Sequence, residues 1–218
     1  MTLRFDPGLM LVTDRRLAGG RLLEDIVDAA VRGGVTAVQL REKDAPTREV
    51  VEIARRLRVR LERAGVPLIV DDRADVALAA GAAGVHLGQD DLPAADARRL
   101  LGPGAFIGLS VENLGQAAGQ DAKAATYLGV SPVFATPTKT DTKAPWGLDG
   151  LRRLRARTDK VLVAIGGIRA GNAAEVMAAG ADGLAVVSAI MAAPDPEAAA
   201  RSLREIVDRA RGAAGRRP

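Results

Sequence analysis

Short apolar runs alternate with longer segments of helical period along almost the whole chain. The runs are rich in Val, Ile and Leu, as in strands that are buried on both faces of a parallel sheet. Each is followed by a segment whose apolar residues recur three and four positions apart, the pattern of a helix with one buried face. The runs lie at residues 10–13, 35–40, 67–70, 85–87, 106–109, 126–130, 161–165 and 183–187. The helical segments lie at 22–32, 47–64, 74–80, 94–101, 114–123, 148–157, 172–179 and 196–210.

Eight strand–helix units in 218 residues predict an α/β fold, a single (β/α)₈ TIM barrel. We expect one domain over residues 1–218, with a frayed tail at about 211–218, because no Pro-, Gly- or Ser-rich linker divides the chain. An open doubly wound sheet is the alternative, but it usually has fewer units and a glycine-rich turn after its first strand. The segment from Thr13 to Arg16 lacks that turn, and no P-loop motif occurs.

The composition excludes several functional classes. There is no cysteine and only one histidine, His86, which excludes disulfides, thiolate metal sites and a His-rich zinc site. Few aromatic residues are present, and the surplus basic residues read as solvated helix faces, so nucleic-acid binding is not expected. No apolar run approaches the roughly 20 residues of a membrane span, and the N-terminus lacks a signal pattern. We therefore expect a cytoplasmic protein; the sequence leaves its oligomeric state open.

Polar residues at the ends of the predicted strands are the first place to look for a site, because a barrel carries its active site there. Gln39, Arg41 and Lys43 alternate at the end of the second strand, so in an extended chain they point the same way. An amide and two cations that converge suit an anionic ligand, most simply a phosphate. The simpler interpretation is a solvated strand exit.

Carboxylates follow the next two strands. Asp72 and Asp91 are predicted to face each other across the barrel mouth, and hard oxygen ligands without His or Cys partners suit Mg²⁺. The alternative is helix capping, because Asp71, Asp72 and Asp91 all precede predicted helices. One aspartate, Asp71 or Asp90, is expected to act only as a cap. Together with Arg41, Lys43 and Lys139, an Mg²⁺ ion would complete a pyrophosphate site.

Glycines after the seventh strand indicate a second anion site. The loops after strands 7 and 8 of such barrels often bind phosphate, and Gly166 and Gly167 let the backbone approach an anion closely. Ser188 begins a short helical segment and suits the same ligand. Two phosphorylated substrates in one barrel mouth suggest group transfer with pyrophosphate as leaving group. A protein nucleophile is not evident, since no cysteine is present and no Ser–His pair has a persuasive spacing.

Seven motifs in this order resemble the thiamine phosphate synthase family over almost the whole chain. They lie at residues 38–43, 71–73, 84–91, 108–110, 127–139, 164–168 and 182–190. The resemblance implies Mg²⁺-dependent transfer of the hydroxymethylpyrimidine group from its pyrophosphate to the nitrogen of hydroxyethylthiazole phosphate, which gives thiamine phosphate and pyrophosphate. It further implies a dissociative reaction, in which pyrophosphate leaves before the thiazole nitrogen attacks.

The resemblance also assigns residues to these ligands. Asp72 and Asp91 would hold Mg²⁺, while Arg41, Lys43 and Lys139 would act on the leaving pyrophosphate. The remaining substrate contacts that it implies are Gln39, Leu40, Glu42 and Asp71 for the pyrimidine pyrophosphate, Ser110 for the pyrimidine ring, and Thr136, Pro137, Thr138, Gly167, Val187 and Ser188 for the thiazole phosphate.

One departure concerns Asp71, where the family usually has Asn. An Asn side chain donates a hydrogen bond to pyrophosphate, and an ionised Asp cannot donate one. Asp71 would instead contact Mg²⁺ or a metal-bound water, or stay protonated. Ser131 stands where the family has Gly, a milder change. Two other readings stay open: a thiazole tautomerase-like barrel, which needs neither the carboxylate pair nor Arg41 and Lys43, and a barrel that only binds phosphorylated ligands or nucleic acid.

Overall fold

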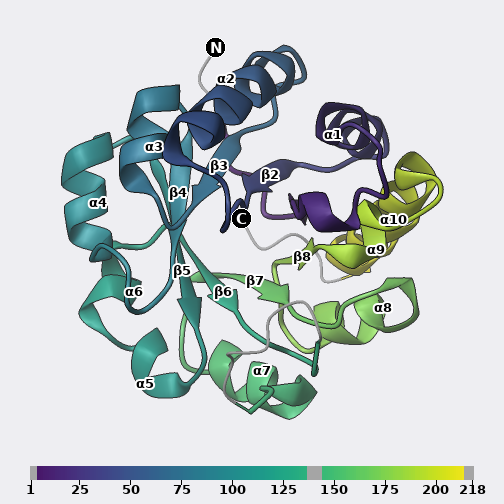
Figure 1. The fold of residues 1–218 in the computed structure, drawn as a ribbon. Coiled ribbons are helices and arrows are strands. Elements are labelled where there is room, and N and C mark those ends of the chain that lie inside the picture. Colours follow the sequence, from purple (N-terminus) through teal and green to yellow (C-terminus); the bar gives the residue numbers. More distant parts are fainter. Residues whose placement is uncertain (1–3, 137–143, 214–218) are drawn as a thin grey trace.

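Eight parallel strands close into a barrel in the computed structural model, which describes residues 4–136 and 144–213. Each strand pairs with its neighbours in sequence, and β1 closes the ring against β8 (Figure 1). The strands are β1 (Leu9–Val12), β2 (Ala37–Leu40), β3 (Leu68–Asp71), β4 (Gly84–Leu87), β5 (Phe106–Val111), β6 (Tyr127–Val130), β7 (Val161–Ile165) and β8 (Gly183–Val186). The predicted single-domain (β/α)₈ fold is therefore confirmed for the described residues.

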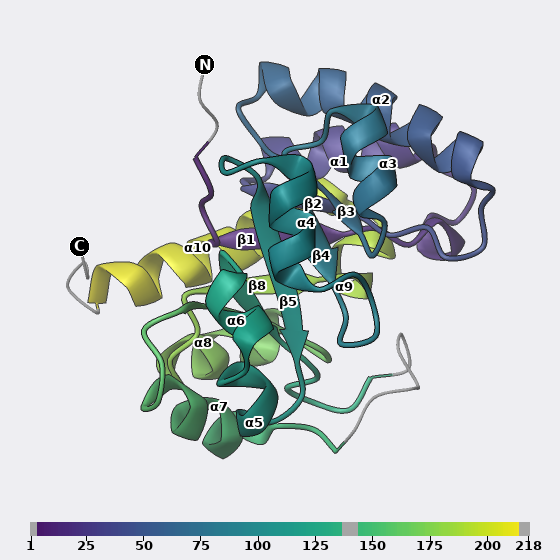
Figure 2. The ribbon, with the colours of Figure 1, turned by 90° about the vertical axis from the view of Figure 1, so that its left-hand side faces the viewer.

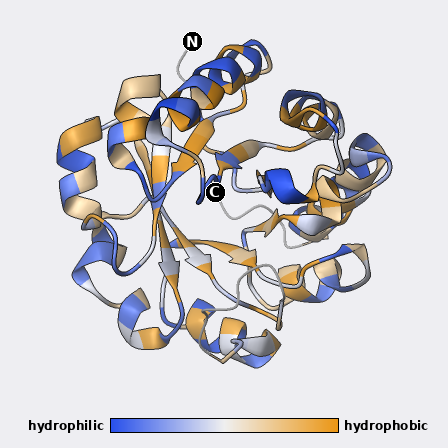
Figure 3. Ribbon diagram, viewed as in Figure 1, coloured by the Kyte–Doolittle hydropathy of each residue, from blue (hydrophilic) through white to orange (hydrophobic). Residues whose placement is uncertain are grey.

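Helices surround the strands on the outside of the ring (Figure 1). Along the described chain they are η1 (Arg15–Leu17), α1 (Leu23–Arg32), α2 (Thr47–Arg63), α3 (Ala74–Ala80), α4 (Ala94–Leu101), α5 (Leu114–Ala117), α6 (Gln120–Ala124), α7 (Gly147–Arg155), α8 (Ala170–Ala178), α9 (Ser188–Met191) and α10 (Pro196–Ala213). Hydrophobic and hydrophilic residues alternate along them, as amphipathic helices require (Figure 3). No described helix is long and apolar enough to cross a membrane.

The alternation of side chains along each strand divides the apolar residues into two cores. Outward-facing residues pack beneath the helices and form the larger core. Inward-facing residues fill the barrel interior in a smaller cluster, which consists of Met10, Val12, Ala37, Ile69, Tyr127, Val163 and Ala185. Phe5 packs against this inner cluster, with its ring 4.7 Å from the Tyr127 ring. The barrel interior is thus filled by side chains below the C-terminal ends of the strands.

Two helical predictions need correction. The single helix expected at 114–123 consists of two short helices, α5 and α6, which are separated at Ala118 and Gly119. The frayed tail expected from residue 211 is wrong for residues 211–213, which continue α10. Arg211 holds this end in place, since its guanidinium lies 2.7 Å from an Asp6 oxygen and donates to the Asp182 carbonyl. Figure 2 shows the resulting neighbourhood of α10 and the N-terminal segment on one side of the barrel. Residues 214–218 lie outside the described residues.

Candidate active site

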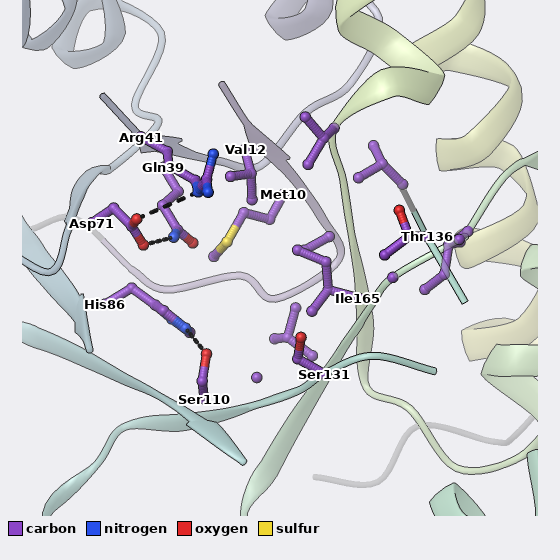
Figure 4. A pocket seen from close by; sticks show the side chains of 18 of the residues that line it. Met10, Val12, Gln39, Arg41, Asp71, His86, Ser110, Ser131, Thr136 and Ile165 are labelled. Atoms are coloured by element: carbon purple, nitrogen blue, oxygen red, sulfur yellow. Dashed lines mark hydrogen bonds and ion pairs between the residues drawn. The ribbon is translucent and has the colours of Figure 1, made fainter. Parts of the chain in front are cut away.

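A cavity of about 530 Å³ opens at the C-terminal ends of the strands, lined by residues of all eight strands or the loops that follow them (Figure 4). Ten of the predicted site residues line it: Gln39, Arg41, Lys43, Asp71, Asp72, Ser110, Thr136, Gly167, Val187 and Ser188. The predicted residues Pro137, Thr138 and Lys139 lie outside the described residues. The strand-end pattern thus brings side chains from distant parts of the sequence to one chamber.

The exit of β2 turns three polar side chains into the cavity and two others away from it. Gln39, Arg41 and Lys43 line the cavity, as their alternation predicts. Leu40 is 1% exposed and packs in the outer core. The Glu42 carboxylate points to the far side of the loop and accepts a 2.7 Å hydrogen bond from Arg15 Nε. The same alternation directs the Leu40 and Glu42 side chains away from the chamber, and the substrate contacts expected of these two residues stay predictions.

Asp71 stands at the centre of a buried polar cluster (Figure 4). Gln39 Nε2 donates to its Oδ1 over 2.6 Å, while Arg41 Nε and Lys43 Nζ lie 3.7 Å and 3.4 Å from its Oδ2. Burial, with a smaller effect of the Asp72 charge, raises the pKa of Asp71 to about 6, although both cations oppose the rise. The carboxyl at the Asn position of the family thus sits among the groups expected to bind pyrophosphate.

Asp72 adopts an unusual backbone conformation with φ at 60°, a region that non-glycine residues rarely occupy. Its N–H donates to the His86 carbonyl over 2.7 Å, which ties the end of β3 to β4. The side chain accepts from Lys43 Nζ, and its charge acts on the neighbouring Asp91 carboxyl. Strain of this kind persists where the surrounding structure holds it, and here it aims the carboxylate into the mouth.

Asp91 completes a pair of carboxyl groups from neighbouring loops. Its Oδ2 accepts a 2.6 Å hydrogen bond from the Gly88 N–H. Burial, and then the charge of Asp72, raise the pKa of Asp91 above its ordinary value. Two neighbouring carboxylates repel each other, and a bound cation would offset that repulsion. Within the described chain no three His, Cys, Asp or Glu side chains gather as a metal cage. The pair suits Mg²⁺, which proteins commonly hold through one or two carboxylates, with phosphate and water oxygens completing the shell.

The opposite wall of the cavity is made largely of backbone. Gly166 and Gly167 have φ values of 104° and 65°, and a Cβ on Gly167 would lie 2.8 Å from Phe134 Cβ and 3.0 Å from the Ala135 carbonyl oxygen. This crowding and the positive φ values both require glycine. The start of α9 at Ser188 follows on the next strand and lines the same wall. The two walls present different anion-binding groups: side-chain cations on one, and glycine backbone with a helix start on the other.

A buried hydrogen-bonded chain that the sequence did not indicate lies on the floor between these walls. His86 Nε2 is 2.9 Å from Ser110 Oγ, and His86 Nδ1 is 2.9 Å from the Tyr127 hydroxyl. The fold thus forms a Ser–His pair that the spacing of these residues in the sequence did not indicate. The available signal was in the strand pattern: a histidine inside an apolar strand, with Gly108 and Gly129 at inward positions of the next two strands leaving room for a large inward side chain.

Comparisons with known proteins agree with this geometry. The family model described as thiamine monophosphate synthase matches residues 9–190. The chain is 60% identical over 200 residues to the thiamine-phosphate synthase of Albidiferax ferrireducens, covering 92% of this chain and 91% of that protein. It is 56% identical to the enzyme of the same name from Chloroflexus aurantiacus, with coverages of 91% and 92%.

A solved structure gives the same picture. The thiamine phosphate pyrophosphorylase from Pyrococcus furiosus superposes with a TM-score of 0.86 at 42% sequence identity, covering 94% of this chain and 97% of that one. The fold, the geometry of the site and the sequence comparisons agree: the chain belongs to the thiamine monophosphate synthase family.

Proposed function

We propose that this protein is a thiamine phosphate synthase. It transfers the hydroxymethylpyrimidine group from its pyrophosphate to the ring nitrogen of hydroxyethylthiazole phosphate, and releases pyrophosphate. The observation that carries the proposal is the convergence of Arg41, Lys43 and Asp72 at one side of a cavity that has a glycine-lined wall opposite. Asp91 lies outside the cavity lining, close enough to Asp72 for the Asp72 charge to raise its pKa. A tautomerase-like barrel needs neither the cations nor the carboxylate pair.

The pyrophosphate of the pyrimidine substrate binds at the exit of β2. Arg41 and Lys43 are now paired with Asp71 and Asp72, so the substrate anion competes for cations that are already oriented toward the cavity. Negative charge grows on the pyrophosphate as its bond to the pyrimidine carbon breaks. Fixed cations in a partly dry site stabilise that charge, and they need not rearrange to do so.

Mg²⁺ is the metal that we propose for Asp72 and Asp91. When bound, it supplies further positive charge to the leaving pyrophosphate. The Gly88 N–H fixes one Asp91 oxygen, and Lys43 contacts Asp72, so both carboxylates are oriented by the protein itself.

The thiazole phosphate occupies the opposite wall in this proposal. Gly167 and the start of α9 at Ser188 offer backbone N–H groups, and Thr136 lies at the edge of the same wall. The roles assigned to Pro137, Thr138 and Lys139 by the family resemblance stay predictions. The expected cytoplasmic location also stays a prediction.

Product formation tests the proposed function directly. Purified protein is incubated with both substrates, with Mg²⁺ or with EDTA, and thiamine phosphate is measured by fluorescence after oxidation to the thiochrome derivative. We expect Mg²⁺-dependent formation of thiamine phosphate together with an equal amount of pyrophosphate. Absence of product under both conditions would contradict the assignment, and equal rates under both would contradict the metal.

A further inference from the structure

Three side chains from β4, β5 and β6 form a hydrogen-bonded chain from the barrel interior to the cavity. Tyr127 is fully buried, and its hydroxyl lies 2.9 Å from His86 Nδ1. His86, which is 8% exposed, reaches Ser110 Oγ over 2.9 Å with its other ring nitrogen. Ser110 lines the cavity, and Figure 4 shows its hydroxyl meeting the His86 ring there. The direction of the two hydrogen bonds decides what Ser110 presents to a ligand.

The Tyr127 hydroxyl determines that direction. Among the described residues, His86 Nδ1 is its hydrogen-bonding partner, and burial raises the pKa of the phenol, so the group keeps its proton. A buried O–H that does not donate loses the hydrogen bond that water gives it in the unfolded chain, and nothing replaces that bond. The phenol therefore donates to Nδ1, which requires Nδ1 to be bare. In a neutral imidazole the proton is then on Nε2, and Nε2–H donates to Ser110 Oγ.

The barrel interior holds this chain in one arrangement. The Phe5 ring stacks on Tyr127 from the other side, with 4.7 Å between ring centroids and 19° between the planes. A Cβ on Gly108 would lie 2.3 Å from Tyr127 Cζ and 2.4 Å from His86 Nδ1, and a Cβ on Gly129 would lie 2.8 Å from His86 Cε1. Both rings thus occupy space that other residues at these glycines would fill. Glycine at these two positions is therefore what leaves room for the tyrosine and the histidine.

We propose that Tyr127 and His86 are positioning residues that orient the Ser110 hydroxyl to donate a hydrogen bond into the cavity. There it selects a ligand that carries a hydrogen-bond acceptor. Ser110 Oγ accepts a hydrogen bond from Nε2–H, so its own O–H is left to point at the ligand. Within the proposed function, on which this step rests, the acceptor is a ring nitrogen of the pyrimidine. The two hydrogen bonds run in the opposite direction to those of a Ser–His–Asp triad, in which Nδ1–H donates to the carboxylate and unprotonated Nε2 accepts the serine proton. The pair therefore orients substrate and does not activate a nucleophile.

The protein has a single histidine, so the direction of these two hydrogen bonds can be measured directly. Protein labelled with ¹⁵N-histidine gives one set of imidazole signals, and two-bond ¹H–¹⁵N correlation spectra distinguish the tautomers. We expect the Nε2–H tautomer in the unmodified protein without substrate. The Nδ1–H tautomer, or a doubly protonated ring, would overturn the proposal, whether or not the protein makes thiamine phosphate.

Two variants separate the two ends of the chain. Tyr127→Phe keeps the ring and its stacking but removes the donor, so we expect a mixture of both tautomers. Ser110→Ala is the matched control, because it leaves the Tyr127–His86 bond intact and should retain the Nε2–H tautomer. If the Tyr127→Phe protein keeps the pure Nε2–H signal, the phenol does not determine the tautomer of His86.

Substrate analogues test the consequence for recognition. In each of two analogues one ring nitrogen of the pyrimidine is replaced by C–H, which removes one acceptor. One analogue lacks the acceptor that faces Ser110. For this analogue we expect kcat/KM to fall about fivefold with the unmodified enzyme and to change by less than about twofold with Ser110→Ala, because one hydrogen bond is worth about 1 kcal/mol. Tyr127→Phe should fall between them. If both analogues lower kcat/KM equally, and to the same extent in the unmodified and Ser110→Ala enzymes, the Ser110 hydroxyl is not the donor that we assign.

Discussion

Replacing Asp71 by Asn is expected to stabilise the protein at neutral pH. The Asp71 side chain is 10% exposed, and burial raises its pKa from 3.8 to about 6 in the folded protein. Each pKa unit is worth about 1.4 kcal/mol, so ionised Asp71 costs the folded state about 3 kcal/mol relative to the unfolded chain. Asn has nearly the same shape, carries no charge, and still accepts the hydrogen bond from Gln39 through its Oδ1.

The pH range of the effect follows from the direction of the shift. The folded state holds the Asp71 proton more tightly than the unfolded chain does, so this group lowers the free energy of unfolding as the pH rises through 4 to 6. Below about pH 4 both states are protonated and the cost is absent; above about pH 6 it is fully present. The stability of Asp71→Asn relative to the unmodified protein should therefore increase by about 3 kcal/mol between about pH 4 and about pH 7.

Urea unfolding followed by circular dichroism measures this difference. Both proteins are unfolded at several pH values in the presence of EDTA, so that no metal binds the neighbouring carboxylates. Asp159→Asn is the control, because Asp159 is exposed and precedes β7 at the other end of the barrel. A difference between Asp71→Asn and the unmodified protein that stays constant with pH would refute the reasoning. Activity that is unchanged or higher in Asp71→Asn would fit the Asn of the family, and its collapse would mean that Asp71 has an essential role.

Three further substitutions test other parts of the structure. Lys43→Ala should lower kcat at least tenfold, since a cation on the leaving group is lost, and Lys43→Arg should retain more activity; a loss under about threefold would contradict the role of Lys43. Gly108→Ala should destabilise the protein by about 1–3 kcal/mol or more through overpacking, whereas Gly104→Ala, with open space around its Cβ, should cost less than about 0.5 kcal/mol in the same denaturation assay. Arg15→Ala should destabilise by about 1–2 kcal/mol and raise KM for the pyrophosphate substrate, because the buried Glu42 carboxylate loses its cation. Adding Glu42→Gln should restore most of that stability, and an undiminished loss would contradict the pairing.

The periodicity of the sequence was sufficient to predict the barrel. Apolar runs such as 161–165 coincide with β7, and the helical segment at 94–101 coincides with α4, because local composition decides which short segments are strands and which are helices. Where local signals were weak, as around Gly119, the prediction merged two short helices into one. The tail was misjudged for a different reason, since Arg211 is held by Asp6, a residue at the other end of the sequence.

Much of the anion-binding site also followed from the sequence. Gln39, Arg41 and Lys43 share a direction because side chains alternate along a strand, and parallel strands end at the same rim. That rule placed Asp72 beside them without any knowledge of distances. The same rule turns the side chains of Leu40 and Glu42 away from the cavity.

The sequence by itself thus determined which residue types stand at the strand ends, and with them the barrel and the family. Only the tertiary structure decided which side chains touch. Strand register brings Tyr127 within 2.9 Å of His86 across 41 positions of sequence, and burial gives Asp71 a pKa of about 6. Both effects depend on distance and on exclusion of water, which arise only when the eight strands close. A hydrogen-bond direction or a shifted pKa is therefore a property of the closed barrel, while the periodicity that builds the barrel is local.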